Sequence, residues 1–143
     1  MKVWQTLYAI IWLMLLEVLF QSKAIDFQGV EYVHMLLGVL VLALAVYNYV
    51  NVNKTAAPDR TKRILKALVT FGTVQPILGI IVFVGGVYNL YGICNMGIVQ
   101  FLHLVVAIAM ITQASSAATS YDMWEEKEFL QPSKPAAQFG QAT

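Results

Sequence analysis

The sequence predicts an all-α integral membrane protein, built as a four-helix up-down-up-down bundle with its N- and C-termini in the cytoplasm. Of its 143 residues, 59% are hydrophobic and only 12% are charged, and the mean hydropathy is +0.66. Residues 67–121 contain no Asp, Glu, Lys or Arg. Soluble domains carry roughly a quarter charged residues. The composition therefore excludes a soluble enzyme, a nucleic-acid-binding protein and a disordered chain.

Four apolar stretches have the length of about 20 residues that a helix needs to cross the hydrocarbon layer. The first stretch also has features of a signal peptide, because Lys2 precedes it and residues 22–24 (SKA) resemble a cleavage site. We expect it to be a membrane helix. The expected spans are residues 3–20, 30–50, 64–88 and 97–119.

The segments between the spans are short, which favours antiparallel neighbouring helices. Every Lys and Arg except Lys23 lies before the first span, between residues 54 and 66, or after the fourth span. Because basic residues gather on the cytoplasmic side, both termini and the middle segment are expected there. We therefore expect a four-helix domain over residues 1–121 and a cytoplasmic tail over residues 122–143.

Ionisable residues inside membrane spans are costly and mark functional sites by default. The spans contain Glu17, Glu31, His34 and His103, all in the outer half of the membrane in the expected topology. At 1.5 Å per residue, His34 lies about 5–8 Å and His103 about 9 Å inside the outer face. The two histidines, the only ones in the chain, are therefore nearly level.

Two level histidines on facing helices can hold one haem iron through two axial imidazoles. Gly38 and Gly79 are small residues at helical spacing that would let a flat macrocycle approach the backbone. Two other interpretations remain open: the histidines link helices without a cofactor, or they form a zinc site. Zinc needs at least three protein ligands, and Cys94 is the remaining candidate.

Two acidic residues and one glutamine surround this expected site. Glu31 and His34 lie at i and i+3 on one helix face, so Glu31 could orient the imidazole, hold a proton, or simply contact the membrane interface. Glu17 has no partner at helical spacing, and we expect a structural role for it. Gln75 directly precedes Pro76 and is expected to form an interhelical hydrogen bond.

Three short motifs resemble the haem A synthase family. Residues 31–34 (EYVH) are similar to its E-x-x-H motif, residues 74–80 (VQPILGI) contain a Q-x-x-L-G pattern, and residues 100–107 (QFLHLVVA) contain H-L-x-x-A. The usual members have eight helices in two similar halves, and this chain corresponds to one half over residues up to about 120. The chain departs from the family at Met35, where an arginine is common, and has Cys94 where many members have a cysteine pair.

The resemblance implies that His34 and His103 are axial ligands and that Glu31 is the carboxylate used in oxidation. It implies contacts between haem and Gly38, Gln75 and Gly79. The family oxidises a ring methyl of haem O to a formyl group, which makes haem A for terminal oxidases. A single histidine pair suggests that catalysis needs a homodimer or a site that differs from that of the family.

Two other functions remain open at this point. One is a b-type haem subunit for electron transfer or structural support in a respiratory oxidase complex, and the other is an accessory membrane subunit without haem. The expected partners are membrane lipid, haem of b, o or a type, and a second copy or other oxidase subunits. The expected location is a prokaryotic cell membrane, with the haem site toward its outer face.

Overall fold

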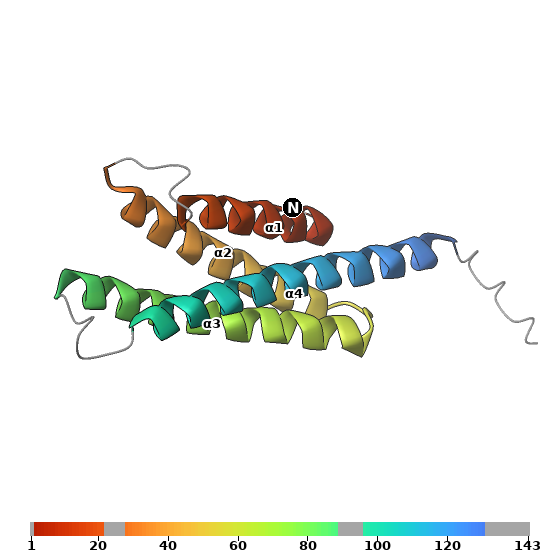
Figure 1. Ribbon diagram of the computed structural model, residues 1–143. Coiled ribbons are helices and arrows are strands. Elements are labelled where there is room, and N and C mark those ends of the chain that lie inside the picture. The colour runs from red at the N-terminus through yellow and green to blue at the C-terminus, as the bar shows by residue number, and fades with distance from the viewer. Residues whose placement is uncertain (1, 22–27, 89–95, 131–143) are drawn as a thin grey trace, which may run out of the picture.

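The computed structural model describes residues 2–21, 28–88 and 96–130, which form four helices (Figure 1). They are α1 (Val3–Gln21), α2 (Val30–Asn53), α3 (Asp59–Val87) and α4 (Met96–Leu130). All four are long and apolar enough to cross a membrane. This confirms the predicted all-helical protein with four membrane-spanning helices.

The residues that directly precede α2 and α3 explain where these two helices begin. Gly29, just before α2, has φ 91°, a left-handed conformation that glycine adopts without strain. Pro58, just before α3, is extended with ψ 144°. Since proline lacks an N–H, it is tolerated at a helix start. The short segment 54–58 therefore turns the chain directly from α2 into α3.

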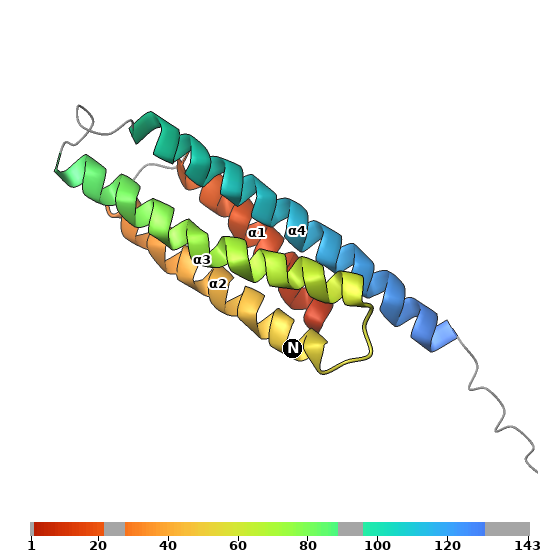
Figure 2. The same ribbon diagram turned by 90° about the horizontal axis from the view of Figure 1, so that it is seen from below.

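Each helix packs mainly against two neighbours, in the cyclic order α1, α2, α3, α4. Helices α2 and α4 are therefore diagonal partners across the bundle, as Figure 2 shows from below. Two hydrogen bonds tie neighbours together: the Thr6 hydroxyl donates to Oδ1 of Asn48, and the hydroxyls of Thr61 and Ser120 are 2.6 Å apart. These bonds place the start of α1 beside the end of α2, and the start of α3 beside the end of α4.

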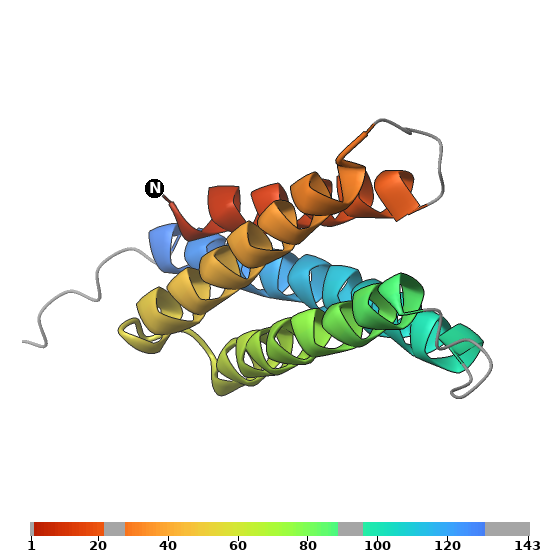
Figure 3. The same cartoon turned by 90° about the vertical axis from the view of Figure 1, so that its left-hand side faces the viewer.

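The apolar core fills the half of the bundle that carries the 54–58 segment, which we call the loop end. Toward the opposite end, which we call the histidine end, α2 diverges from α3 in both Figures 1 and 3. Large apolar side chains such as Trp12 and Leu36 point outward and are exposed, as expected of a surface in contact with lipid. The core consists of Leu7, Ile10, Met14, Val41, Ala45, Val52, Ala57, Leu65, Leu68, Ala107, Met110, Ala114, Ala117, Ala118 and Tyr121.

The helices extend beyond two of the expected spans. Helix α3 begins at Asp59 instead of residue 64, and α4 continues to Leu130, as the charged, helix-compatible residues after the fourth span indicate. Both extensions are charged or polar segments that hydropathy leaves outside a span. Tyr121 and Trp124 pack together in the α4 extension, with ring centroids 5.3 Å apart. The rest of the expected tail, from residue 131, lies outside the described residues.

Candidate functional site

Four polar side chains, one from each helix, meet where the apolar core ends toward the histidine end. Glu17 comes from α1, His34 from α2, Gln75 from α3 and His103 from α4. Glu17 is buried, with 6% of its surface exposed, and the other three are half-buried. A carboxyl group buried in an apolar bundle lowers the stability of the fold unless it is paired. Glu17 is therefore expected to have a partner.

The partner of Glu17 is His34. The Glu17 carboxylate contacts Nδ1 of His34 through its Oε2 atom. A carboxylate beside Nδ1 favours a proton on that nitrogen, which leaves the lone pair of a neutral imidazole on Nε2. Metal-binding histidines commonly have such a carboxylate on their second ring nitrogen. With Nδ1 in contact with Glu17, Nε2 of His34 is the ring nitrogen left available to another partner.

His34 and His103 face each other across the diagonal of the bundle. Their ring centroids are 6.1 Å apart and the ring planes are inclined at 68°. A metal–imidazole bond is about 2 Å long and the ring centre lies about 1 Å beyond the nitrogen, so an ion held between two imidazoles places the centroids about 6 Å apart. The spacing therefore fits one metal ion ligated from both sides.

His103 rests against α3 at Gly79. A Cβ atom added to Gly79 would lie 3.4 Å from Cε1 of the imidazole, an ordinary contact distance, so the ring lies beside this position of α3. The backbone of Gln75 also lies beside this ring. Gly79 thus supports a histidine, whereas the sequence suggested that it gives space to a macrocycle.

Several buried polar atoms around the two rings have no hydrogen-bond partner. They are Oε1 of Glu17, Nδ1 of His34, Oε1 of Gln75 and Nδ1 of His103. Of these, Nδ1 of His34 has its ion-pair contact with Glu17. The interhelical hydrogen bond expected for Gln75 is absent at its oxygen. Buried polar atoms are usually satisfied, and four such atoms on four helices are consistent with a site that holds a polar or metal-containing group.

The remaining predicted site residues lie apart from this cluster. Glu31 is exposed and makes no hydrogen bond or ion pair within the described part of the chain, so it does not orient His34. Gly38 is exposed, and a Cβ atom added there would meet nothing within 4 Å. The space beside Gly38 is therefore open and could accommodate a bulky group such as a macrocycle. Cys94 falls outside the described residues.

Glu17 is the residue whose role sequence reasoning missed. Its depth in the membrane matched that of the histidines, which was the available signal. The rotation of α1 about its own axis decides whether the carboxylate faces inward, and α1 is apolar around its whole circumference. The sequence therefore gives no face from which to infer the contact.

The described residues contain no metal site with three or more protein ligands. Over residues 2–21, 28–88 and 96–130, no group of three or more His, Cys, Asp or Glu side chains is arranged to hold a metal ion. Haem differs in this respect, because its porphyrin supplies the equatorial ligands and the protein supplies only the axial ones. Two imidazoles facing each other meet that requirement.

No family model, curated protein or solved structure matches this chain. Function is therefore inferred from the three short motifs and the geometry of the site. That geometry defines a class: a multi-pass membrane protein with a paired-histidine site in its bundle.

Proposed function

We propose that this chain is a membrane haem protein in which His34 and His103 are the two axial ligands of the iron. One observation carries the proposal: the only two histidines of the chain lie on diagonal helices with their ring centroids 6.1 Å apart. The contact between Glu17 and Nδ1 of His34 supports it, because it directs Nε2 to the metal.

We infer an up-down-up-down topology with both termini in the cytoplasm and the haem site toward the outer face of a prokaryotic cell membrane. The distribution of basic residues supports this orientation, since most of them lie at the loop end or next to the termini. The contacts of Thr6 with Asn48 and of Thr61 with Ser120 are those of antiparallel neighbours.

The protein residues have distinct tasks in this proposal. Glu17 positions His34 and compensates its positive charge if the imidazole is protonated. Gly79 allows His103 to rest against α3. Gln75 has a buried oxygen that is free to accept a hydrogen bond from a bound group. The apolar side chains of the bundle exclude water, which strengthens each of these electrostatic interactions.

For the activity, we propose the oxidation of the haem O methyl group to a formyl group, which makes haem A for terminal oxidases. Haem, when bound, would supply the redox chemistry. The conversion is a four-electron oxidation that takes one oxygen atom from water and passes its electrons to an acceptor outside this chain. Glu31 lies one turn before His34 on α2 and is exposed without a described partner, so its carboxylate is free to hold a proton at the edge of the site. A homodimer would supply the second histidine pair that a full-length synthase carries.

A second candidate is a b-type haem subunit for electron transfer or structural support in a respiratory oxidase complex. The observation that favours it is that Glu31 contacts none of the other site residues, while both axial positions would be filled by imidazoles. A site of that kind transfers electrons without binding a substrate at the iron. Its partners would be other membrane subunits of the oxidase.

Haem content tests the shared part of both candidates. Purified full-length protein is expected to carry stoichiometric haem, and His34→Gln or His103→Gln should each reduce its content at least about tenfold. Glutamine retains hydrogen-bonding capacity, so an accessory protein whose histidines only link helices would be little affected. Gln113→Ala, a half-buried polar residue on the same helix as His103, is the matched control. Full haem content in both histidine variants, or no haem in the wild type, would contradict the proposal.

Haem type separates the two candidates. The chain is expressed together with a source of haem O, and the haem is extracted and identified by mass. Synthase activity predicts haem A in the wild type, and haem O without haem A in Glu31→Gln, while Asp59→Asn at the loop end behaves as wild type. Wild-type protein that retains haem but never yields haem A would favour the electron-transfer subunit.

A further inference from the structure

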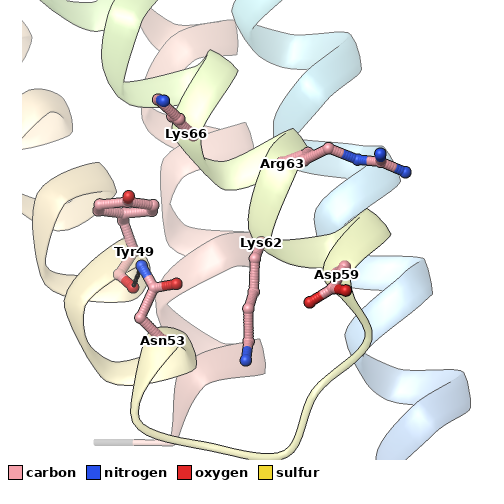
Figure 4. A pocket seen from close by; sticks show the side chains of 6 residues that line it. All are labelled: Tyr49, Asn53, Asp59, Lys62, Arg63 and Lys66. Carbon is pink, nitrogen blue, oxygen red and sulfur yellow. Dashed lines mark hydrogen bonds between the residues drawn. The ribbon is translucent and has the colours of Figure 1, made fainter.

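An open cavity with charged residues in its lining lies at the loop end, far along the bundle from the histidines. It opens between the end of α2 and the start of α3 and has a volume of about 330 Å³. The proposed haem site uses none of its residues. The cavity is lined by Tyr49, Asn53, Asp59, Lys62, Arg63 and Lys66 (Figure 4).

The charge of this cavity is predominantly positive. Its lining contains three basic side chains against the single carboxylate of Asp59. Within the described parts of the chain, none of these four charged side chains forms an ion pair. Figure 4 shows Lys62 extending between Asn53 and Asp59, while the guanidinium of Arg63 points away from the α2 side. Three cations with one carboxylate give the lining a net positive charge, which attracts an anion.

The α2 wall of the cavity is held in a defined position. Nδ2 of Asn53 donates a hydrogen bond to the backbone oxygen of Tyr49 at 2.9 Å, which fixes this side chain against its own helix. Lys62 and Lys66 are one turn apart on α3, and Figure 4 shows their ammonium groups directed toward opposite ends of the cavity. Two ammonium groups and a polar wall are suited to the oxygen atoms of a phosphate.

An apolar surface continues from the cavity toward the middle of the membrane. On α2, Val46 and Val50 are exposed and precede Asn53 at helical spacing. On α3, the face of Lys66 passes Thr70 and Thr73, whose hydroxyls donate to backbone oxygens of their own helix, and reaches Ile77, which is exposed. The distance from Lys66 to Ile77 is about 16 Å along the helix axis, which is about half of a 30 Å hydrocarbon layer. The surface therefore has the length of one leaflet.

We propose that this cavity binds the phosphate group of an anionic membrane phospholipid, whose acyl chains lie along the apolar surface of α2 and α3. The basic lining supplies the attraction to the phosphate, and the apolar surface distinguishes a lipid from free phosphate. A zwitterionic lipid brings its own positive charge toward the three cations, so an anionic headgroup is preferred. This site depends on the position of the chain in a membrane and is independent of the haem proposal.

Native mass spectrometry of the full-length protein in detergent tests the site. The protein is titrated separately with phosphatidylglycerol, phosphatidylcholine and inorganic phosphate, and the bound fraction gives each dissociation constant. Phosphatidylglycerol should bind most tightly. The double variant Lys62→Gln/Lys66→Gln should weaken its binding roughly tenfold, and Asp59→Asn, which removes the only carboxylate of the lining, should strengthen it about two- to fivefold.

Two further variants distinguish a site from general surface attraction. Lys54→Gln/Arg60→Gln removes two exposed positive charges from the same end of the bundle but outside the cavity, and it should change the dissociation constant less than about twofold. Lys62→Arg/Lys66→Arg keeps the charges and should keep the binding, which guards against a loss caused by misfolding.

Three results would overturn the proposal. An equal loss of phosphatidylglycerol binding in the two glutamine double variants would show unspecific attraction to the loop end. Equal binding of phosphatidylcholine and phosphatidylglycerol would remove the selectivity for an anionic headgroup. Inorganic phosphate that binds as tightly as phosphatidylglycerol would assign the cavity to free phosphate instead of a lipid.

Discussion

Replacing Glu17 by leucine should destabilise the chain even before any cofactor binds. The carboxylate is 6% exposed and contacts Nδ1 of His34, whose side chain is 26% exposed. Breaking a fully buried ion pair costs about 3–5 kcal/mol, and leaving one buried polar group unsatisfied costs about 1–3 kcal/mol. Because the imidazole is partly exposed, we expect Glu17→Leu to lower the free energy of unfolding by about 2 kcal/mol. Glu17→Gln retains an acceptor and should cost about 1 kcal/mol.

The same replacements should weaken haem binding. Removing the carboxylate behind a metal-binding histidine commonly costs about 10–100-fold in affinity, so Glu17→Gln should raise the dissociation constant of haem at least about tenfold. Glu31→Gln is the matched control, because Glu31 is a carboxylate on α2 that is exposed and does not contact His34. It should leave both stability and haem affinity within about 0.5 kcal/mol of wild type.

Two measurements check these values. Unfolding is followed by the loss of helical circular dichroism as a denaturing detergent is added, and haem affinity is followed by the absorbance change on titrating apoprotein. The set Glu17→Leu, His34→Leu and the double variant gives the coupling energy of the pair. The reasoning is refuted if the coupling energy is zero, or if Glu31→Gln weakens haem binding as much as Glu17→Gln.

Three other predictions concern packing in the bundle; haem content measures the first, and the same unfolding assay measures the other two. Gly79→Leu should displace the imidazole that rests on this glycine and remove most of the bound haem, whereas Gly79→Ala, with ordinary contact distances, should retain it. Gly85→Ala places a methyl group on the Met96 side chain and should lower the free energy of unfolding by about 1 kcal/mol. In a Met96→Ala background, Gly85→Ala should lower it by much less. An unchanged cost in that background would contradict the contact. Thr6→Val and Asn48→Leu remove a buried interhelical hydrogen bond, so their coupling energy should be about 0.6–1.7 kcal/mol, and a coupling near zero would contradict its contribution.

Hydropathy and charge were sufficient to predict the helical fold, because each span is an uninterrupted apolar stretch between polar segments. The same signal placed the helix ends poorly where helices leave the membrane. Arg60, Lys62 and Arg63 lower the hydropathy at the start of α3 but are fully compatible with helix, so the helix begins before them. Helix propensity and membrane burial are separate quantities, and only burial is measured by hydropathy.

The site was predictable to the extent that it depends on depth along the helices. Counting residues from the span ends made His34 and His103 level, and the structure brings their rings to 6.1 Å. Contacts that depend on helix rotation were not predictable. The i and i+3 spacing suggested Glu31 as the carboxylate next to His34, yet the contact comes from Glu17 on another helix. In helices that are apolar on all sides, no amphipathic pattern shows which face turns inward.

The central claim is that one iron is held by both histidines, and the spin state of ferric haem tests it most directly. Electron paramagnetic resonance of the purified, haem-loaded protein should give only low-spin signals in the wild type, because two imidazoles form a strong ligand field. His34→Gln and His103→Gln should each convert the remaining haem to high spin, while Gln113→Ala stays low-spin. Low-spin haem that persists in both histidine variants would contradict the account.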